Sequence, residues 1–170
     1  PIRLKQGAFN FFNAIKLSCL CKFMDSAKFL RKATNMLMGK EDWWVFEKLL
    51  KMEAEAGVRA IYHFYADDRR KTIKQWLFDP SYNLSDDKIK NLVNKLIDEG
   101  HKVGLHPSYD AWGDSLKISS QRENLERNTG LVVKACRQHW LRFSWEHTWR
   151  VQTEAGIEFD STLMFNDRPG

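Results

Sequence analysis

The sequence predicts an α/β fold in which parallel strands are joined by crossover helices. Stretches with apolar residues at three- and four-residue spacing alternate with short runs of β-branched and aromatic residues. A glycine follows each helical stretch, directly before the next strand. Because a strand reached through a helix pairs in parallel with its neighbour, an open parallel sheet and a (β/α) barrel both fit this pattern.

The composition is that of a globular domain that can bury a core, with 170 residues, 43% hydrophobic and 29% charged. No apolar run is long enough to span a membrane, and the apolar stretch from Ala8 to Met24 lacks a signal-peptide cleavage site. Three cysteines, Cys19, Cys21 and Cys136, cannot all pair. We therefore expect buried free thiols and a cytoplasmic location.

The first part of the chain predicts two amphipathic helices, over 9–24 and 26–38, and a third that Asp42 caps and Gly57 ends. The net charge is +5, and in residues 1–40 Asp25 is the only acid among many lysines and arginines. A basic face attracts nucleic acid, anionic lipid or anionic saccharide, but a solvated helix face has the same composition. We expect residues 1–40 to pack on the remaining domain, residues 41–170, through Phe12, Ile15, Phe23, Phe29 and Leu30.

The predicted elements after Gly57 follow in a regular order. A capping box of Ser120 and Glu123 marks a helix that ends near Gly130. The other elements are strands over 58–65, 102–105, 131–136 and 157–160, and helices over 85–100 and from 144 to Gly156.

Polar residues follow the predicted strands, where the active sites of such folds lie. His106 and Asp110 follow the second strand, Arg137 and His139 the third, and Asp160 the fourth. Arg137 and His139 occupy alternate positions of an extended run, so we expect them to share a side. Imidazole and carboxylate groups at separate strand ends suit a divalent metal ion that activates water. Taken singly, His106 also fits a loop histidine with a satisfied hydrogen bond.

Aromatic and basic side chains of the same segments are candidate substrate-binding residues: Tyr109, Trp112, Trp140 and Arg142. Most of the seven tryptophans are expected in the core, but Trp112 and Trp140 fall at the predicted site, where they could stack on a sugar ring. The sequence contains no H-E-x-x-H motif, glycine-rich phosphate loop or G-x-S-x-G motif.

Two segments resemble the polysaccharide deacetylase family. Residues 99–109 are similar to its "GHEIGLHS" segment, and residues 155–163 resemble its "AGFEYDSSL" segment. Residues 137–142 fall where the arginine motif of the family belongs. The resemblance covers residues 41–170 and is closest to a divergent branch associated with surface-polysaccharide biosynthesis.

The resemblance implies a distorted (β/α) barrel, a divalent metal ion that is usually zinc, and hydrolysis of N-acetyl groups on a glycan. His106 matches the first histidine of the metal motif. Asp110 stands where the second histidine is expected, so either Asp110 or His139 is the next ligand, and we prefer His139 because imidazole competes better for zinc. Arg137 matches the arginine that orients the catalytic carboxylate, and Asp160 is our other candidate catalytic residue.

The catalytic aspartates of the family would precede Pro1, so we expect the chain to be a piece of a longer protein with an incomplete barrel. The leading hypothesis is a metal-dependent carbohydrate deacetylase acting on a surface-polysaccharide precursor in the cytosol. The alternative is a non-catalytic relative that binds a glycan or a partner enzyme. Nucleic-acid binding by the basic residues 1–40 is the least expected function.

Overall fold

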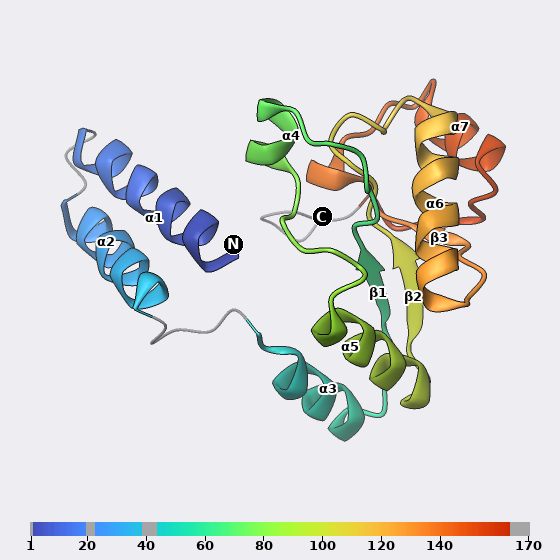
Figure 1. Ribbon diagram of the computed structural model, residues 1–170, viewed down its shortest axis with the longest axis horizontal. Helices are drawn as coiled ribbons and strands as arrows, with labels where there is room; N and C mark the ends of the chain where they lie inside the picture. The colour runs from blue at the N-terminus through green and yellow to red at the C-terminus, as the bar shows by residue number, and fades with distance from the viewer. Residues whose placement is uncertain (1, 20–22, 39–43, 164–170) are drawn as a thin grey trace. The chain divides into compact units, whose positions relative to one another are not determined.

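A computed structural model describes residues 2–19, 23–38 and 44–163 (Figure 1). The chain divides into two compact units, Pro1–Met52 and Glu53–Gly170. The division that we expected after Lys40 falls outside the described residues.

The first unit contains an antiparallel pair of helices, α1 (Ile2–Cys19) and α2 (Phe23–Leu37). The Ser26 hydroxyl donates a 2.7 Å hydrogen bond to the Ala14 carbonyl, and Asn10 contacts Met36 near the other end of the pair. Small side chains, with Ala14 and Ala33 buried, let the two helices approach closely. In the same unit α3 (Phe46–Glu55) begins, while its predicted cap Asp42 lies outside the described residues.

The apolar face that we expected to pack on the domain is not covered by the helix pair itself. Phe12, Ile15 and Leu30 are 65%, 49% and 47% exposed, whereas Phe29 is half-buried. The side chain of Phe23 lies outside the described part. Packing of this face on the second unit therefore stays a prediction.

In the described part of the chain, every helix is too short or too polar to span a membrane. The expectation of buried thiols is confirmed for Cys136, which is fully buried, and is wrong for Cys19, which is exposed because α2 does not cover that side of α1. Cys21 is outside the described residues.

The second unit is built on a parallel sheet, which confirms the predicted α/β fold class. Its strands pair in the order β1-β2-β3-β4. They are β1 (Ile61–Phe64), β2 (Lys102–Leu105), β3 (Ala135–Cys136) and β4 (Phe159–Asp160). The third strand is shorter than the predicted run 131–136. Before the strand begins, the main-chain amide of Val133 donates to the Glu126 side chain instead of to a neighbouring strand.

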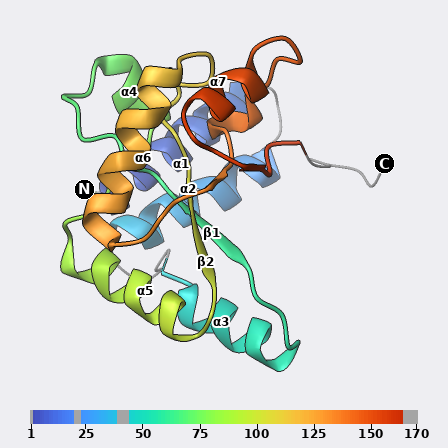
Figure 2. The same ribbon diagram turned by 90° about the vertical axis from the view of Figure 1, so that its right-hand side faces the viewer.

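Three helices cover one face of the sheet (Figures 1 and 2). These are α5 (Asp87–Asp98), α6 (Ser115–Thr129) and α7 (Thr148–Glu154). Leu96 of α5 and Leu125 of α6 are fully buried together with Leu105 and Cys136 of the strands. The Gln152 side chain of α7 reaches Cys136, so α7 covers the same face.

The observed start of α6 differs from the prediction, whereas the glycines that end helices are as predicted. α6 begins at its N-cap Asp114, whose carboxylate accepts from the Lys117 amide, so the predicted capping box of Ser120 and Glu123 is wrong because both lie inside the helix. The four glycines expected to end helices have φ angles between 66° and 82°, a left-handed conformation that other residues rarely adopt.

The structure contains a short helix that the sequence analysis did not predict. α4 (Ile73–Phe78) starts with a capping box, in which Thr72 and Gln75 satisfy each other's main-chain amides. Its last residue, Phe78, leads directly to the buried Asp79.

The face of the sheet opposite the three helices has a close approach at Gly104. A Cβ atom there would lie 2.6 Å from the His63 ring and 3.1 Å from the Ala135 carbonyl oxygen. We predict that Gly104→Ala destabilises the protein by ~1–3 kcal/mol because of overpacking. Urea denaturation tests this, with Gly113→Ala as control because no atom lies within 4 Å of its added Cβ. Equal stability of the two variants would contradict the packing described.

Candidate functional site

The structure brings His106 and His139 into direct contact at the carboxyl ends of neighbouring strands. His106 follows β2 immediately, and His139 follows β3 after two residues. The Nε2 atom of His106 lies 2.6 Å from the Nδ1 atom of His139, and the rings meet edge to face. These inner nitrogens are the closest approach of two titratable side chains in the predicted site.

Both imidazoles are held by main-chain carbonyl groups at their outer nitrogens. His106 Nδ1 lies 2.7 Å from the Arg137 carbonyl oxygen, and His139 Nε2 lies 2.7 Å from the Phe78 carbonyl oxygen. A carbonyl oxygen only accepts hydrogen bonds, so each outer nitrogen must carry its proton. The two inner nitrogens then face each other at hydrogen-bonding distance, an arrangement that a proton between them stabilises and that a metal ion in place of the proton would also stabilise.

We expect Arg137 and His139 to share a side of an extended run, and Gln138 between them has an extended conformation, with φ −63° and ψ 137°. A short 3₁₀ helix, η1 (His139–Leu141), starts at His139, and Trp140 has a φ of 57°. The extended run therefore ends directly after His139.

Asp79 is a buried carboxylate that the sequence analysis did not single out. Its Oδ1 atom accepts a 2.8 Å hydrogen bond from the Tyr109 amide and lies 3.8 Å from His139 Nε2. Burial raises the pKa of the Asp79 carboxyl above its ordinary value, while the Tyr109 amide and His139 act in the opposite direction. Asp79 thus ties the end of α4 to the loop after β2 and to the histidine pair.

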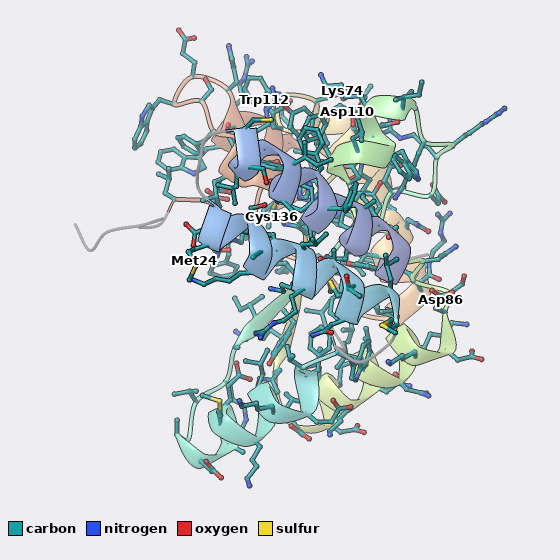
Figure 3. The ribbon with its side chains drawn as sticks, turned by 90° about the vertical axis from the view of Figure 1, so that its left-hand side faces the viewer. Met24, Lys74, Asp86, Asp110, Trp112 and Cys136 are labelled. Atoms are coloured by element: carbon teal, nitrogen blue, oxygen red, sulfur yellow. The ribbon has the colours of Figure 1, made fainter. Side chains whose placement is uncertain are left out.

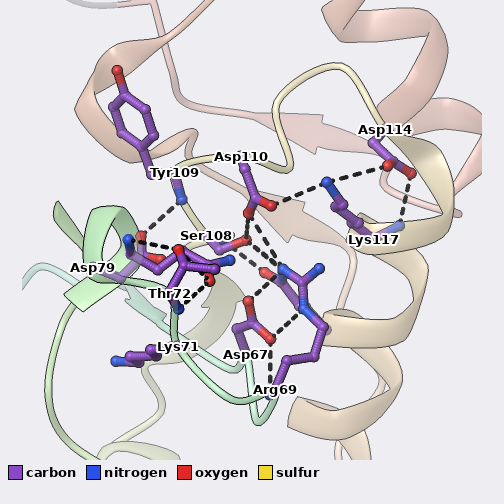
Figure 4. A network of polar contacts seen from close by, with 12 residues as sticks. Asp67, Arg69, Lys71, Thr72, Asp79, Ser108, Tyr109, Asp110, Asp114 and Lys117 are labelled. Carbon is purple, nitrogen blue, oxygen red and sulfur yellow. Dashed lines mark hydrogen bonds and ion pairs between the residues drawn. The ribbon is translucent and has the colours of Figure 1, made fainter. Parts of the chain in front are cut away.

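Asp110 faces basic side chains rather than the imidazoles (Figure 4). Its Oδ1 atom accepts from the Ser108 hydroxyl at 2.8 Å and from Arg69 at 3.3 Å, and its Oδ2 atom accepts from Lys117 at 3.0 Å. Arg69 also pairs with Asp67. Within the described ranges, no group of three or more histidine, cysteine or acidic residues is arranged to hold a metal ion. Asp110 therefore does not complete a ligand set with the two histidines here.

Asp160 and Arg137 lie near His63 of β1. Burial and, to a lesser degree, Arg137 lower the pKa of His63 to about 4, and Asp160 opposes this lowering. The Asp160 carboxylate accepts from Gln152, Trp149 and the Thr162 hydroxyl. These bonds fix the turn after β4, where Thr162 in turn accepts from the Gln138 amide.

The four candidate substrate-binding residues belong to one aromatic and basic group. The Tyr109 ring stacks on Phe78 with centroids 4.7 Å apart, and Phe78 meets Trp140 edge to face at 5.7 Å. The Arg142 guanidinium lies 4.4 Å from the Tyr109 ring centroid and 4.8 Å from that of Trp112. Trp140 also lies edge to face with His139 at 6.2 Å, so the group adjoins the histidine pair.

The site residues that the sequence analysis missed come mostly from α4 and its surroundings: Lys74, Phe78, Asp79 and Arg69. The signal that could have located them is the capping box of Thr72 and Gln75, which marks a helix in a segment that we left unassigned.

Comparison with known proteins supports the fold. No protein-family model matches the chain, and no curated protein matches it. A crystal structure described as that of a "putative polysaccharide deacetylase from Mycobacterium smegmatis" is similar, with a TM-score of 0.52 and 17% sequence identity. The match covers 89% of this chain and 47% of the mycobacterial one, so this chain spans about half the length of that protein. The likeness shows an α/β fold of the polysaccharide deacetylase type.

The ion-pair network makes a prediction about pH. Burial alone would raise the pKa of Asp110, but Ser108, Lys117 and Arg69 hold it well below its usual range. A carboxylate with a lowered pKa stabilises the folded state fully above its unfolded pKa of about 4, and this contribution is lost as the pH falls below that value.

We expect Asp110→Asn to lower the free energy of unfolding by ~1 kcal/mol at about pH 7, because Asp110 is partly exposed. The difference from wild type should shrink below about pH 4. Urea titrations at several pH values test this, and Asp68→Asn, at an exposed carboxylate nearby, is the control. A deficit of the Asp110 variant that persists unchanged at about pH 2.5 would refute the electrostatic explanation.

Proposed function

We propose that this chain is part of a metal-dependent hydrolase that removes acetyl groups from a carbohydrate, with a surface-polysaccharide precursor as substrate. The observation that carries the proposal is the pair of inner nitrogens on His106 and His139, 2.6 Å apart at the carboxyl ends of β2 and β3. The fold likeness to a deacetylase-type structure supports the same class of chemistry.

The two histidines fit a divalent metal ion in their chemistry. A histidine that binds a metal commonly donates its other N–H to a carbonyl or carboxylate, which fixes the tautomer and the ring orientation. Both rings do so here, to Arg137 and Phe78. Burial, together with His139, lowers the pKa of His106 to about 4, so at neutral pH His106 is the neutral imidazole that a ligand must be.

The remaining site residues have roles around these two nitrogens. A bound zinc ion would lower the pKa of a water molecule and polarise the amide carbonyl of the substrate. The Phe78 carbonyl orients His139, with the Asp79 carboxylate 3.8 Å from the same Nε2 atom. Asp110 positions the Ser108–Tyr109 loop through its bonds to Ser108 and to basic side chains. We retain Arg137 as the residue that orients a catalytic carboxylate.

We assign Asp160 a positioning role, because its oxygens hold the turn that carries Thr162. The exposed rings of Trp140 and Phe78 provide a surface on which a sugar can stack beside His139. This surface orients the substrate relative to the paired imidazoles.

The second candidate is a glycan-binding protein of the same fold without catalytic activity. The described residues supply two imidazoles but no third metal ligand beside them. The aromatic rings that could stack on a sugar are all in place within the same residues. Acetate release from an N-acetylated oligosaccharide separates the two functions, because a binding protein would retain the saccharide unchanged.

The zinc affinity of the full-length protein tests the metal site. We expect His106→Ala and His139→Ala each to weaken Zn²⁺ binding ~100-fold, because each removes one of the converging ligands. Asp110→Asn should change the affinity less than about threefold, because Asp110 is paired with Arg69 and Lys117. Isothermal titration with Zn²⁺ measures the affinity, and thermal unfolding of each variant checks that it is folded.

Zinc affinity retained by both histidine variants would end the metalloenzyme proposal. Loss of zinc affinity only in Asp110→Asn would instead show that Asp110, and not the histidines, is the ligand. Acetate release should follow zinc affinity across the three variants.

A further inference from the structure

Arg142 is held against two aromatic rings in a position that leaves most of its hydrogen-bonding capacity unused. Its guanidinium lies over both Tyr109 and Trp112, and one amino group donates a 2.8 Å hydrogen bond to the Tyr109 carbonyl. A guanidinium has five N–H groups, of which this bond uses one. Stacking on two rings fixes its plane before any ligand arrives, which lowers the entropic cost of binding.

The described residues offer Arg142 no carboxylate partner, because the neighbouring acids are engaged elsewhere. Asp110 pairs with Arg69 and Lys117, and Asp114 pairs with Lys117 and caps α6 (Figure 4). Asp79 accepts from the Tyr109 amide and is fully buried. The positive charge of Arg142 is therefore not neutralised by the acidic residues of its own surroundings.

A second cation lies at the same ring. The Lys74 ammonium of α4 is 5.1 Å from the Tyr109 ring centroid, and no ion pair is formed by Lys74 in the part of the chain that the structure describes. Figure 3 shows Lys74 and Trp112 at the same end of the second unit. Two positive charges at one aromatic ring make this part of the surface electropositive, and an anion nearby is attracted to both of them.

We propose that the saccharide bound here carries a negatively charged group, a carboxylate or a phosphate, and that Arg142 and Lys74 recognise it. This inference rests on the proposed function in taking the ligand to be a saccharide. A guanidinium matches a carboxylate or phosphate through paired hydrogen bonds, and Lys74 adds a point charge. The continuous set of rings from Tyr109 through Phe78 to Trp140 then leads from the charged group to His139.

Binding of three probes to the full-length protein tests the inference. The probes are a hyaluronan tetrasaccharide, which carries carboxylates, N-acetylglucosamine 1-phosphate, which carries a phosphate, and the neutral tetra-N-acetylchitotetraose (chitotetraose below). We expect at least one anionic probe to bind about tenfold more tightly than chitotetraose at low salt, and to lose that advantage as salt is added. The anionic probe that shows the advantage identifies the charged group.

Substitutions of Arg142 and Lys74 test whether these two residues recognise the negative charge of the saccharide. Arg142→Gln should weaken binding of the preferred anionic probe about tenfold, Arg142→Lys less, and Lys74→Gln about threefold. Lys90→Gln, at an exposed lysine of α5, is the matched control and should have no effect. Chitotetraose binding should be unchanged in Lys74→Gln, which leaves the contacts between Arg142 and Tyr109 intact.

Two results would overturn the inference. One is equal affinity of the wild-type protein for the anionic and neutral probes. The other is an equal loss for both kinds of probe in Lys74→Gln and Arg142→Lys, which would mean that these residues only support the aromatic surface. Binding is measured without reference to acetate release, so a protein that prefers anionic saccharides but releases no acetate contradicts the proposed function and leaves this inference standing.

Discussion

The candidate site depends on the register between two short parallel strands. β2 and β3 pair at Leu105 and Cys136, and the Arg137 amide then donates to the Leu105 carbonyl. This register places the Arg137 carbonyl 2.7 Å from His106 Nδ1, which sets the direction of the ring. The buried side chains of Leu105 and Cys136 hold the register from the opposite face, under the helices. A slip of one residue would exchange the two faces and separate His106 from its carbonyl partner.

The second histidine depends on a segment far away in the sequence. The Phe78 carbonyl at the end of α4 fixes His139, and Asp79, the next residue, binds the Tyr109 amide in the loop after β2. That loop is held from its other side by the ion pairs among Asp67, Arg69, Asp110 and Lys117 (Figure 4). The carboxylates at this end of the unit therefore mostly bind basic side chains and main-chain amides that hold the loops of the site in place. Within the described residues, Arg142 and Lys74 form no ion pair with these carboxylates.

The sequence was sufficient for the parallel α/β fold, because glycines after helices and the change from helical to strand periodicity are local signals. It also located His106, Arg137, His139 and the aromatic residues near strand ends. It could not show that Trp140 takes a left-handed conformation, which ends the extended run directly after His139. Nor could it show that Asp110 is paired with Arg69 and Lys117, since these contacts join segments 41 and 7 residues apart. Asp79 was missed for the same reason, because only tertiary contacts distinguish it from an ordinary loop carboxylate.

We infer that the outer nitrogens of both histidines carry protons and that their inner nitrogens share a cation. Long-range ¹H–¹⁵N correlation spectra of the imidazole rings, recorded with and without Zn²⁺, test it directly. We predict protonated His106 Nδ1 and His139 Nε2 in both states, and zinc-induced shifts at His106 Nε2 and His139 Nδ1. A protonated His106 Nε2 with an unprotonated Nδ1, or spectra in which zinc moves neither inner nitrogen, would contradict it.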